Sequence, residues 1–138
     1  MNRKEPVSNI MTKDVITLHL NDSLFEAERL FKRHHIRHIP VVKKRKIVGM
    51  LSLTDLQRLS FVDSYDDSGQ VDGAIFELLT VGQIMAANPE RVSSSTIIKD
   101  VAALLAKKEF HALPVVDDEK LVGIVTTTDL LKYLVDQY

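Results

Sequence analysis

The sequence predicts an α+β fold made of two similar units that pack face to face with pseudo-twofold symmetry. The first reason is an internal repeat. Shifting the 138-residue sequence by 74 positions aligns residues 7–56 with residues 81–130 without a gap, and 13 of those 50 positions are identical. The second reason is that both copies have the same order of expected elements, an extended segment, a helix, two strands and a helix. Two copies are too few for a solenoid, so a packed pair is expected.

The identical positions fall in short blocks that keep their order in both copies. The pairs are Val7 with Val81, Ile10-Met11 with Ile84-Met85, Leu30 with Leu104, Pro40-Val41-Val42 with Pro114-Val115-Val116, Lys46 with Lys120, Val48-Gly49 with Val122-Gly123, and Thr54-Asp55-Leu56 with Thr128-Asp129-Leu130. The predicted organisation is therefore a first repeat over residues 1–61, a linker over 62–74 and a second repeat over 75–138.

The first copy opens with a short extended segment, VITL, at residues 15–18. A helix is predicted over residues 23–34, because Ser23 and Glu26 have capping-box spacing and the apolar residues that follow mark one helical face. The β-branched runs HIPVV (38–42) and KIVGML (46–51) predict two strands, and TDLQRLSF (54–61) predicts the start of a second helix.

The second copy repeats this order. Helices are predicted over residues 98–109 and 128–138, and strands over 112–116 and 120–125. The acidic, Gly- and Ser-containing stretch VDSYDDSGQVDG predicts a solvated linker, and its aspartates lack the spacing of a calcium loop. Residues 74–85 predict one short helix that leads into the second copy.

Composition excludes several classes of protein. The net charge is -1, which argues against a dedicated nucleic-acid binder, and there is no cysteine for disulfides, zinc or thiol chemistry. Neither a signal peptide nor an apolar run of membrane-spanning length is present. We therefore expect a cytoplasmic protein with no membrane or nucleic-acid partner. No phosphate-cradling, dinucleotide-binding, zinc-protease or nucleophile-elbow motif occurs, so catalysis is not expected.

The stretch FKRHHIRHIPVVKKRK, residues 31–46, combines three histidines with seven basic residues. The second copy serves as its control, because KKRK at 43–46 corresponds to DDEK at 117–120. A turn that is basic in one copy and acidic in the other is interpreted as an exposed hairpin, although unlike turns could also steer a partner or pair across a dimer. A metal site is not expected, because a helix must end between His34 and His38.

The strongest local signal is a junction that occurs in both copies, GMLSLTD at residues 49–55 and GIVTTTD at 123–129. Each has a strand, a hydroxyl residue and an Asp at a helix start. Helix capping alone explains such residues. The same arrangement suits a ligand, because a helix N-terminus attracts phosphate and a carboxylate accepts hydrogen bonds from a ribose diol.

With these motifs the chain resembles the CBS domain pair, or Bateman module. The resemblance covers about residues 7–135 and rests on IRHIPVV with IVGMLSLTDL in the first copy and ALPVV with LVGIVTTTDL in the second. It implies two β-α-β-β-α units with two clefts between them. It also implies a regulatory module that binds AMP, ADP, ATP or S-adenosylmethionine, requires no cofactor, forms a homodimer and reports to an effector protein.

The resemblance also implies which residues line each cleft, with the hydroxyl and Asp of one copy facing the other copy. The first cleft would use Thr126, Thr128 and Asp129, facing Thr17, Ile36, Arg37 and His38. The second would use Ser52, Thr54 and Asp55, facing Arg91, Phe110 and His111. In the first, Arg37 and His38 would meet phosphates; in the second, Phe110 would stack on a base. Ala112 stands where the first copy has His38, so the cleft with Asp129 is favoured for a charged nucleotide.

One further class of function remains open. The chain could be a ligand-free module that dimerises or docks on a partner, a reading that the apolar helices suggest. Each predicted ligand-binding residue also has an ordinary structural explanation, as a core, strand or solvated surface residue.

Overall fold

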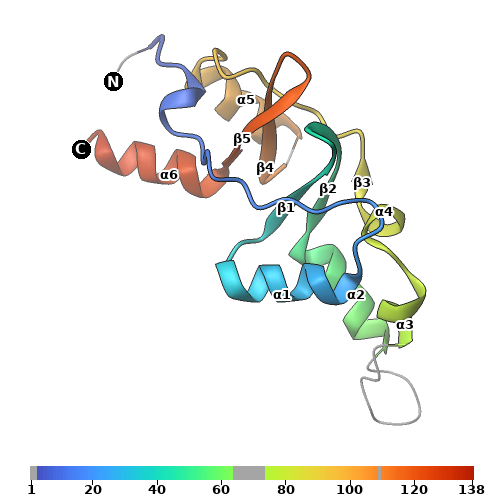
Figure 1. The fold of residues 1–138 in the computed structure, drawn as a ribbon. Coiled ribbons are helices and arrows are strands. Elements are labelled where there is room, and N and C mark those ends of the chain that lie inside the picture. Colours follow the sequence, from blue (N-terminus) through green and yellow to red (C-terminus); the bar gives the residue numbers. More distant parts are fainter. Residues whose placement is uncertain (1–2, 64–73, 109) are drawn as a thin grey trace. The chain divides into compact units, whose positions relative to one another are not determined.

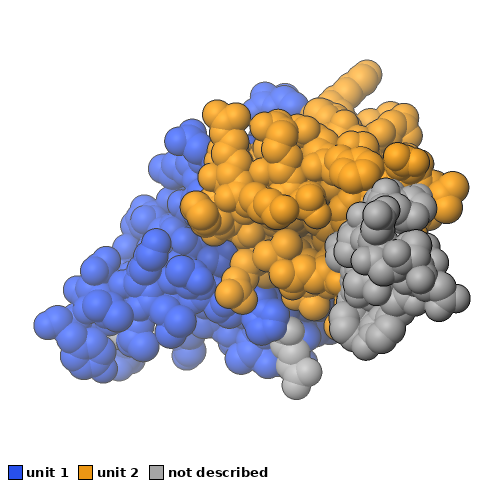
Figure 2. Space-filling model, turned by 90° about the horizontal axis from the view of Figure 1, so that it is seen from below, with its two compact units in different colours: residues 1–15, 45–47, 89–138 blue, residues 16–44, 48–88 orange. Residues whose placement is uncertain are grey.

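The computed structural model describes residues 3–63, 74–108 and 110–138. It divides into two compact units, which Figure 2 colours separately. Unit 1 contains residues 1–15, 45–47 and 89–138, and unit 2 contains residues 16–44 and 48–88. Most of the predicted linker, residues 64–73, lies outside the described residues.

Unit 2 holds most of the first copy (Figure 1). Its elements are α1 (Leu24–His34), β1 (His38–Lys43), β2 (Lys46–Ser52), α2 (Leu53–Asp63), α3 (Ala74–Leu78), α4 (Val81–Ile84) and β3 (Ala86–Ala87). The strands form one sheet in the order β1-β2-β3. Its core lies between the sheet and the helices, with Leu24 and Phe31 from α1, Ile39 from β1 and Leu51 from β2 all buried.

Unit 1 holds most of the second copy. It contains the short 3-10 helix Val7–Asn9, α5 (Ile98–Lys108), the antiparallel pair β4 (Ala112–Asp117) and β5 (Lys120–Thr126), and α6 (Thr127–Asp136). Its core joins Val7 to Val101 and Leu105 of α5, with buried residues of β4 and β5. The predicted order of a helix, two strands and a helix is confirmed in both copies.

The hydrogen bonds of the two copies are related by the same shift of 74 residues as the sequence. The predicted extended segment at 15–18 makes a single parallel bridge, Leu18 to Val41, instead of a full strand. Its counterpart is the bridge from Val92 to Val115. In each case two backbone hydrogen bonds of 2.8–3.2 Å hold the bridge, so both copies use one residue to extend the sheet edge.

The segments that lead into the two copies are exchanged between the units. Thr12, from the first copy, exchanges two backbone hydrogen bonds with Ile124 of β5 in unit 1, at 2.8 and 3.0 Å. In unit 2, Ala86 of β3 takes the corresponding place opposite Met50 of β2. Each unit is therefore completed by a piece of the other copy.

Two local predictions are corrected. Ser23 caps α1 by accepting from the Glu26 N–H at 3.1 Å, but the Glu26 carboxylate binds Arg29 at 2.6 and 2.9 Å instead of returning to the cap. The helix predicted over 74–85 is two helices, α3 and α4. The break follows from Thr80, whose backbone N–H donates to Gln83 Oε1 at 2.8 Å and starts a new helix.

The two unlike hairpin turns pair with each other in unit 1. Lys46 lies 3.3 Å from the carboxylate of Glu119, and the Leu121 N–H donates to the Arg45 carbonyl at 2.9 Å. The Lys46 and Glu119 side chains are both largely exposed, so this ion pair contributes little to stability. The Lys46–Glu119 ion pair nevertheless shows that the basic turn and the acidic turn contact each other within one chain.

Candidate functional site

In the first copy, the repeated junction lies where β2 ends at Ser52 and α2 begins at Leu53. The Ser52 hydroxyl accepts from the Asp55 N–H at 3.1 Å and caps the first turn of α2. The Leu53 N–H donates to the Arg37 carbonyl at 2.8 Å, which ties the junction to the segment before β1. The half-buried Asp55 carboxylate also lies 3.7 Å from Arg58. A hydroxyl and a carboxylate thus stand together at a helix N-terminus.

The second copy builds the same junction between β5 and α6. The Thr126 hydroxyl accepts from the Asp129 N–H at 3.2 Å, and Asp129 Oδ2 accepts from the Thr126 N–H at 2.9 Å. The Thr127 N–H donates to the His111 carbonyl at 3.1 Å, as Leu53 does to Arg37 in the first copy. The recurrence of these bonds means that the shared sequence GxxS/TxTD encodes one backbone geometry.

The two carboxylates differ in what holds them. Asp129 Oδ2 also accepts from the Thr126 hydroxyl at 3.2 Å, so a complete capping box orients this side chain. Asp55 instead has Arg58 nearby, one turn along α2. Among the described residues, the hydrogen bonds of the Asp129 carboxylate go to Oδ2.

The other first-copy residues of the predicted clefts lie in unit 2. Thr17 is half-buried and precedes the bridge at Leu18, and His38 is half-buried at the first position of β1. Arg37 is exposed, whereas Ile36 packs against the core of unit 2. Thr54 is exposed at the second position of α2. Ile36, which is predicted to line the first cleft, thus also has a structural role in the core of unit 2.

The corresponding second-copy residues lie in unit 1. The exposed Arg91 donates to the Pro89 carbonyl at 3.2 Å, and Thr128 is exposed at the second position of α6. Phe110 and His111 are both exposed just before β4, and 39% of the Phe110 surface is accessible. An aromatic side chain this exposed contributes little to the core and offers a surface on which a flat ring could stack.

The structure thus groups the predicted residues by copy. Unit 2 contains Thr17, Ile36, Arg37, His38, Ser52, Thr54 and Asp55, and unit 1 contains Arg91, Phe110, His111, Thr126, Thr128 and Asp129. Each predicted cleft takes residues from both units. The assignment of residues to clefts stays a prediction.

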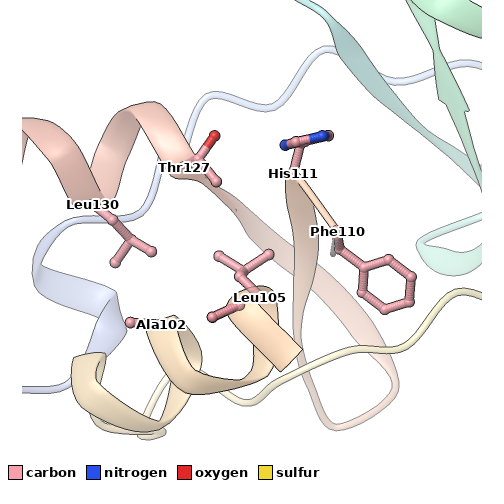
Figure 3. A pocket seen from close by; sticks show the side chains of 7 residues that line it. Ala102, Leu105, Phe110, His111, Thr127 and Leu130 are labelled. Carbon is pink, nitrogen blue, oxygen red and sulfur yellow. The ribbon is translucent and has the colours of Figure 1, made fainter. Parts of the chain in front are cut away.

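Sequence reasoning missed two features of unit 1. Asp117, at the end of β4, accepts from the Ser94 hydroxyl at 2.5 Å and from the Ser94 N–H at 3.0 Å. These hydrogen bonds lower the pKa of the Asp117 carboxyl. The other is a pocket between α5 and the first turn of α6, which Figure 3 shows. Comparing the side-chain sizes of the two copies at matched positions could have revealed the pocket.

Neither metal nor membrane binding gains support from the described ranges. No group of three or more His, Asp or Glu side chains within residues 3–63, 74–108 and 110–138 is placed to hold a metal ion. In the same ranges, no helix has both the length and the apolar character needed to cross a bilayer.

Comparison with known protein families gives two matches that together cover most of the chain. The model for the CBS domain matches residues 7–61 and again residues 81–136. Among curated proteins, the chain is 31% identical to the CBS domain-containing protein YhcV of Bacillus subtilis, over 90% of this chain and 81% of that protein. It spans only 22–48% of three other curated relatives.

Solved structures give the same fold. The CBS domain pair of protein MJ0100, in complex with 5′-methylthioadenosine and S-adenosyl-L-methionine, is 28% identical with a TM-score of 0.77, covering 94% of this chain and 98% of that chain. CBSX2, in complex with AMP, is 28% identical with a TM-score of 0.80, covering 96% of this chain and 98% of that chain.

Proposed function

The chain belongs to the CBS domain family, and from this premise we propose that it is a regulatory module that binds adenosine-containing ligands. The observation that carries the proposal is the junction that recurs at Ser52–Asp55 and Thr126–Asp129. Relatives that match over almost the whole chain hold AMP, S-adenosyl-L-methionine and 5′-methylthioadenosine. The ligand set proposed here is AMP, ADP, ATP or S-adenosylmethionine.

The chemistry of the junction suits a nucleotide. In the first turns of α2 and α6, the N–H groups of the first and third residues donate to Arg37, Ser52, His111 and Thr126. The N–H groups of the second residues, Thr54 and Thr128, and the partial positive charge of the helix start would favour a phosphate. The exposed Thr54 and Thr128 hydroxyls lie in the same turns. An ionised Asp can accept two hydrogen bonds from the ribose diol, which an adenine base lacking its sugar could not offer.

The two sites differ in charge. In the first, Arg37 and His38 would face Asp129 and supply positive charge for phosphates. In the second, Arg91 and His111 would face Asp55, but Ala112 provides no polar side chain where the first copy has His38. We therefore assign the charged nucleotide to the site with Asp129. The site with the exposed ring of Phe110 is assigned a nucleoside of lower charge.

The module is proposed to regulate, not to catalyse. Binding would change how an effector protein is contacted, and the proposed location is the cytoplasm. Asp55 and Asp129 belong to separate sites, so the pair of carboxylates that hydrolysis often requires is not proposed.

Isothermal calorimetry with AMP, ADP, ATP and S-adenosylmethionine tests the proposal. Asp129→Ala should weaken nucleotide binding at least about tenfold, because charge-assisted hydrogen bonds contribute ~1.5–3 kcal/mol. The same change should cost only about 0.3–1 kcal/mol of folding free energy, the usual contribution of a carboxylate in the first turn of a helix.

Asp100→Ala is the matched control, because Asp100 lies in the first turn of α5 without the strand junction. It should bind the nucleotide as the parent does. If none of the four ligands binds even at millimolar concentration, the proposed ligand class is wrong.

A second candidate function, homodimerisation, has its own observation. Leu131, Leu134, Val135 and Tyr138 follow the i, i+3, i+4, i+7 spacing of one helical face on and after α6, and all are exposed. An apolar stripe of this kind is typical of a helix that packs on a partner. In an antiparallel pair of α6 helices centred at Leu134, Lys132 would oppose Asp136 of a second copy, so the charges are complementary.

Sedimentation equilibrium tests this second candidate. Leu134→Lys should shift the protein from dimer to monomer, because it places a charge inside the apolar stripe. Leu78→Lys is the control, since Leu78 is an exposed leucine on α3 that lies outside the α6 stripe. A parent protein that remains monomeric at high concentration would exclude the dimer, and nucleotide binding would be unaffected by that result.

A further inference from the structure

Unit 1 contains a pocket of about 580 Å³ on the side of its two helices (Figure 3). Ala102, Leu105 and Ala106 line it from α5, and Thr127 and Leu130 line it from α6. Phe110 and His111 complete the lining from the segment before β4. In Figure 3 the Phe110 ring points away from Leu105 and Leu130, so it does not fill the space.

The first copy shows why the space exists. The same fold position carries Phe31 where the second copy has Leu105, and Leu53 where it has Thr127. Phe31 is buried and Leu53 packs against the core of unit 2. Leu105 and Thr127 are smaller than their counterparts in the first copy, and both line the pocket, so less side-chain volume fills this place in the second copy.

A third matched position changes in orientation more than in size. Ile36 packs against the core of unit 2, whereas its counterpart Phe110 is 39% exposed and lies outside the core cluster of unit 1. The pocket is therefore a property of the second copy, not a requirement of the fold.

The lining specifies the chemistry of an occupant. The side chains are aliphatic or aromatic except for the Thr127 hydroxyl and the His111 imidazole. Among the residues that the structure describes, no Lys, Arg, Asp or Glu lines the pocket. A phosphate would lose its hydration here without gaining an ion pair, which is unfavourable. The volume lies within the range of about 300–1,000 Å³ that is typical of pockets for small molecules.

We propose that this pocket binds an uncharged, largely apolar small molecule with at least one ring or branched aliphatic group, and that the Thr127 hydroxyl orients its polar end. The pocket shares Phe110 and His111 with the second proposed nucleotide site and Thr127 with the start of α6, but its lining includes neither Asp55 nor Asp129. It goes beyond the proposed nucleotide-binding function and does not depend on it.

The test uses N-phenyl-1-naphthylamine, an uncharged dye whose fluorescence rises in apolar surroundings, added to the full chain. Saturable binding of one dye per chain is expected. Ala106→Leu and Thr127→Leu each fill the pocket, and Thr127→Leu copies the residue that the first copy has there. Each should weaken dye binding at least about tenfold. A melting temperature equal to or above that of the parent would show that both variants fold.

Ala103→Leu is the matched control, because Ala103 is an exposed alanine of the same helix that does not line the pocket. It should leave the dye affinity within about twofold of the parent. AMP binding by Ala106→Leu, measured by calorimetry, should be unchanged.

Three outcomes would overturn the proposal. One is dye binding that never saturates, and another is an equal loss of dye binding in Ala103→Leu. The third is a change of oligomeric state in Ala106→Leu with dye affinity unaltered, which would make the pocket a contact between copies. If neither the parent nor its variants bind AMP but the parent still binds the dye, only the nucleotide proposal is rejected.

Discussion

Among single residues, Asp117 connects the end of β4 to the loop before α5. Both of its carboxylate oxygens accept hydrogen bonds from Ser94, one from the side chain and one from the backbone. The hydroxyl of Ser94, followed by its backbone N–H, lowers the pKa of this carboxyl below its ordinary value of 3.8. The first copy has Lys43 and Leu20 at the matched positions, so this connection occurs only once.

The lowered pKa predicts how stability depends on pH. A carboxyl whose pKa falls on folding stabilises the native state above its unfolded pKa, and this contribution is lost as the pH falls through the folded pKa. Ser94→Ala should therefore lower the melting temperature at neutral pH. The difference from the parent should shrink as the pH drops below about 3.8. Thermal melts between neutral and acidic pH measure this difference.

Ser95→Ala is the control for that experiment, because Ser95 is the exposed neighbour of Ser94 and its hydroxyl lies 3.1 Å from the Ser93 hydroxyl instead of bonding Asp117. Its effect on the melting temperature should be small at every pH. A Ser94→Ala deficit that stays constant down to strongly acidic pH would mean that the Asp117 bonds are not its cause.

Among the elements, β2 and β5 each contain a glycine on which a methionine of the other copy packs. The three atoms nearest to a Cβ atom at Gly49 would all belong to the Met85 side chain. A Cβ atom at Gly123 would lie 2.7 Å from Met11 Sδ and also 3.0 Å from the Thr12 carbonyl oxygen. A methionine side chain can move aside, whereas Thr12 is held by two hydrogen bonds to Ile124.

Alanine substitution should therefore affect the two glycines unequally. Gly123→Ala should destabilise the protein by about 1–3 kcal/mol, the usual cost of overpacking, and Gly49→Ala should cost less. Urea denaturation measures both changes. In the double variant Gly49→Ala/Met85→Ala, the shorter side chain at position 85 should remove the clash. If Gly49→Ala and Gly123→Ala destabilise the protein equally, the Thr12 backbone is not what makes Gly123 more sensitive.

Local patterns predicted most elements, because the signals that set them are local. HIPVV and KIVGML are strands in the structure, and the helix predicted at residue 98 begins there. The predictions failed where a second local interaction competed. Arg29 takes the Glu26 carboxylate from the cap, and Thr80 interrupts an apolar run that otherwise has helical character.

Across the whole molecule, the sequence could not reveal which copy completes which unit. Met11 and Met85 are identical in the repeat, as are Gly49 and Gly123, so the alignment fits packing within a copy as well as packing between copies. No local pattern marks the pocket, because Leu105 and Thr127 lie far apart in the chain; only a comparison with their larger counterparts Phe31 and Leu53 indicates it. The hydroxyl–Asp junctions were predictable because strand, cap and carboxylate are consecutive.

The exchange of segments predicts how two halves of the chain would behave. A chain divided between residues 63 and 74 leaves residues 1–15 of unit 1 on one fragment and residues 89–138 on the other. Unit 2 is divided in the same way. Neither fragment alone should reach the native circular dichroism spectrum, and mixing the two should restore it. If one fragment alone unfolds cooperatively and has the ellipticity per residue of the parent protein, the exchanged segments are dispensable for folding.

The exchange through Met11 and Met85 also bears on how such a chain could arise. A lone ancestral copy would present a bare glycine strand with no segment of its own to cover it. It would also carry a leading segment with nothing to cover. Two separate ancestral molecules could satisfy both needs only by trading these segments with each other. The tandem chain is then a covalently joined form of that pair, in which gene duplication replaced an encounter between molecules with a connection along one backbone.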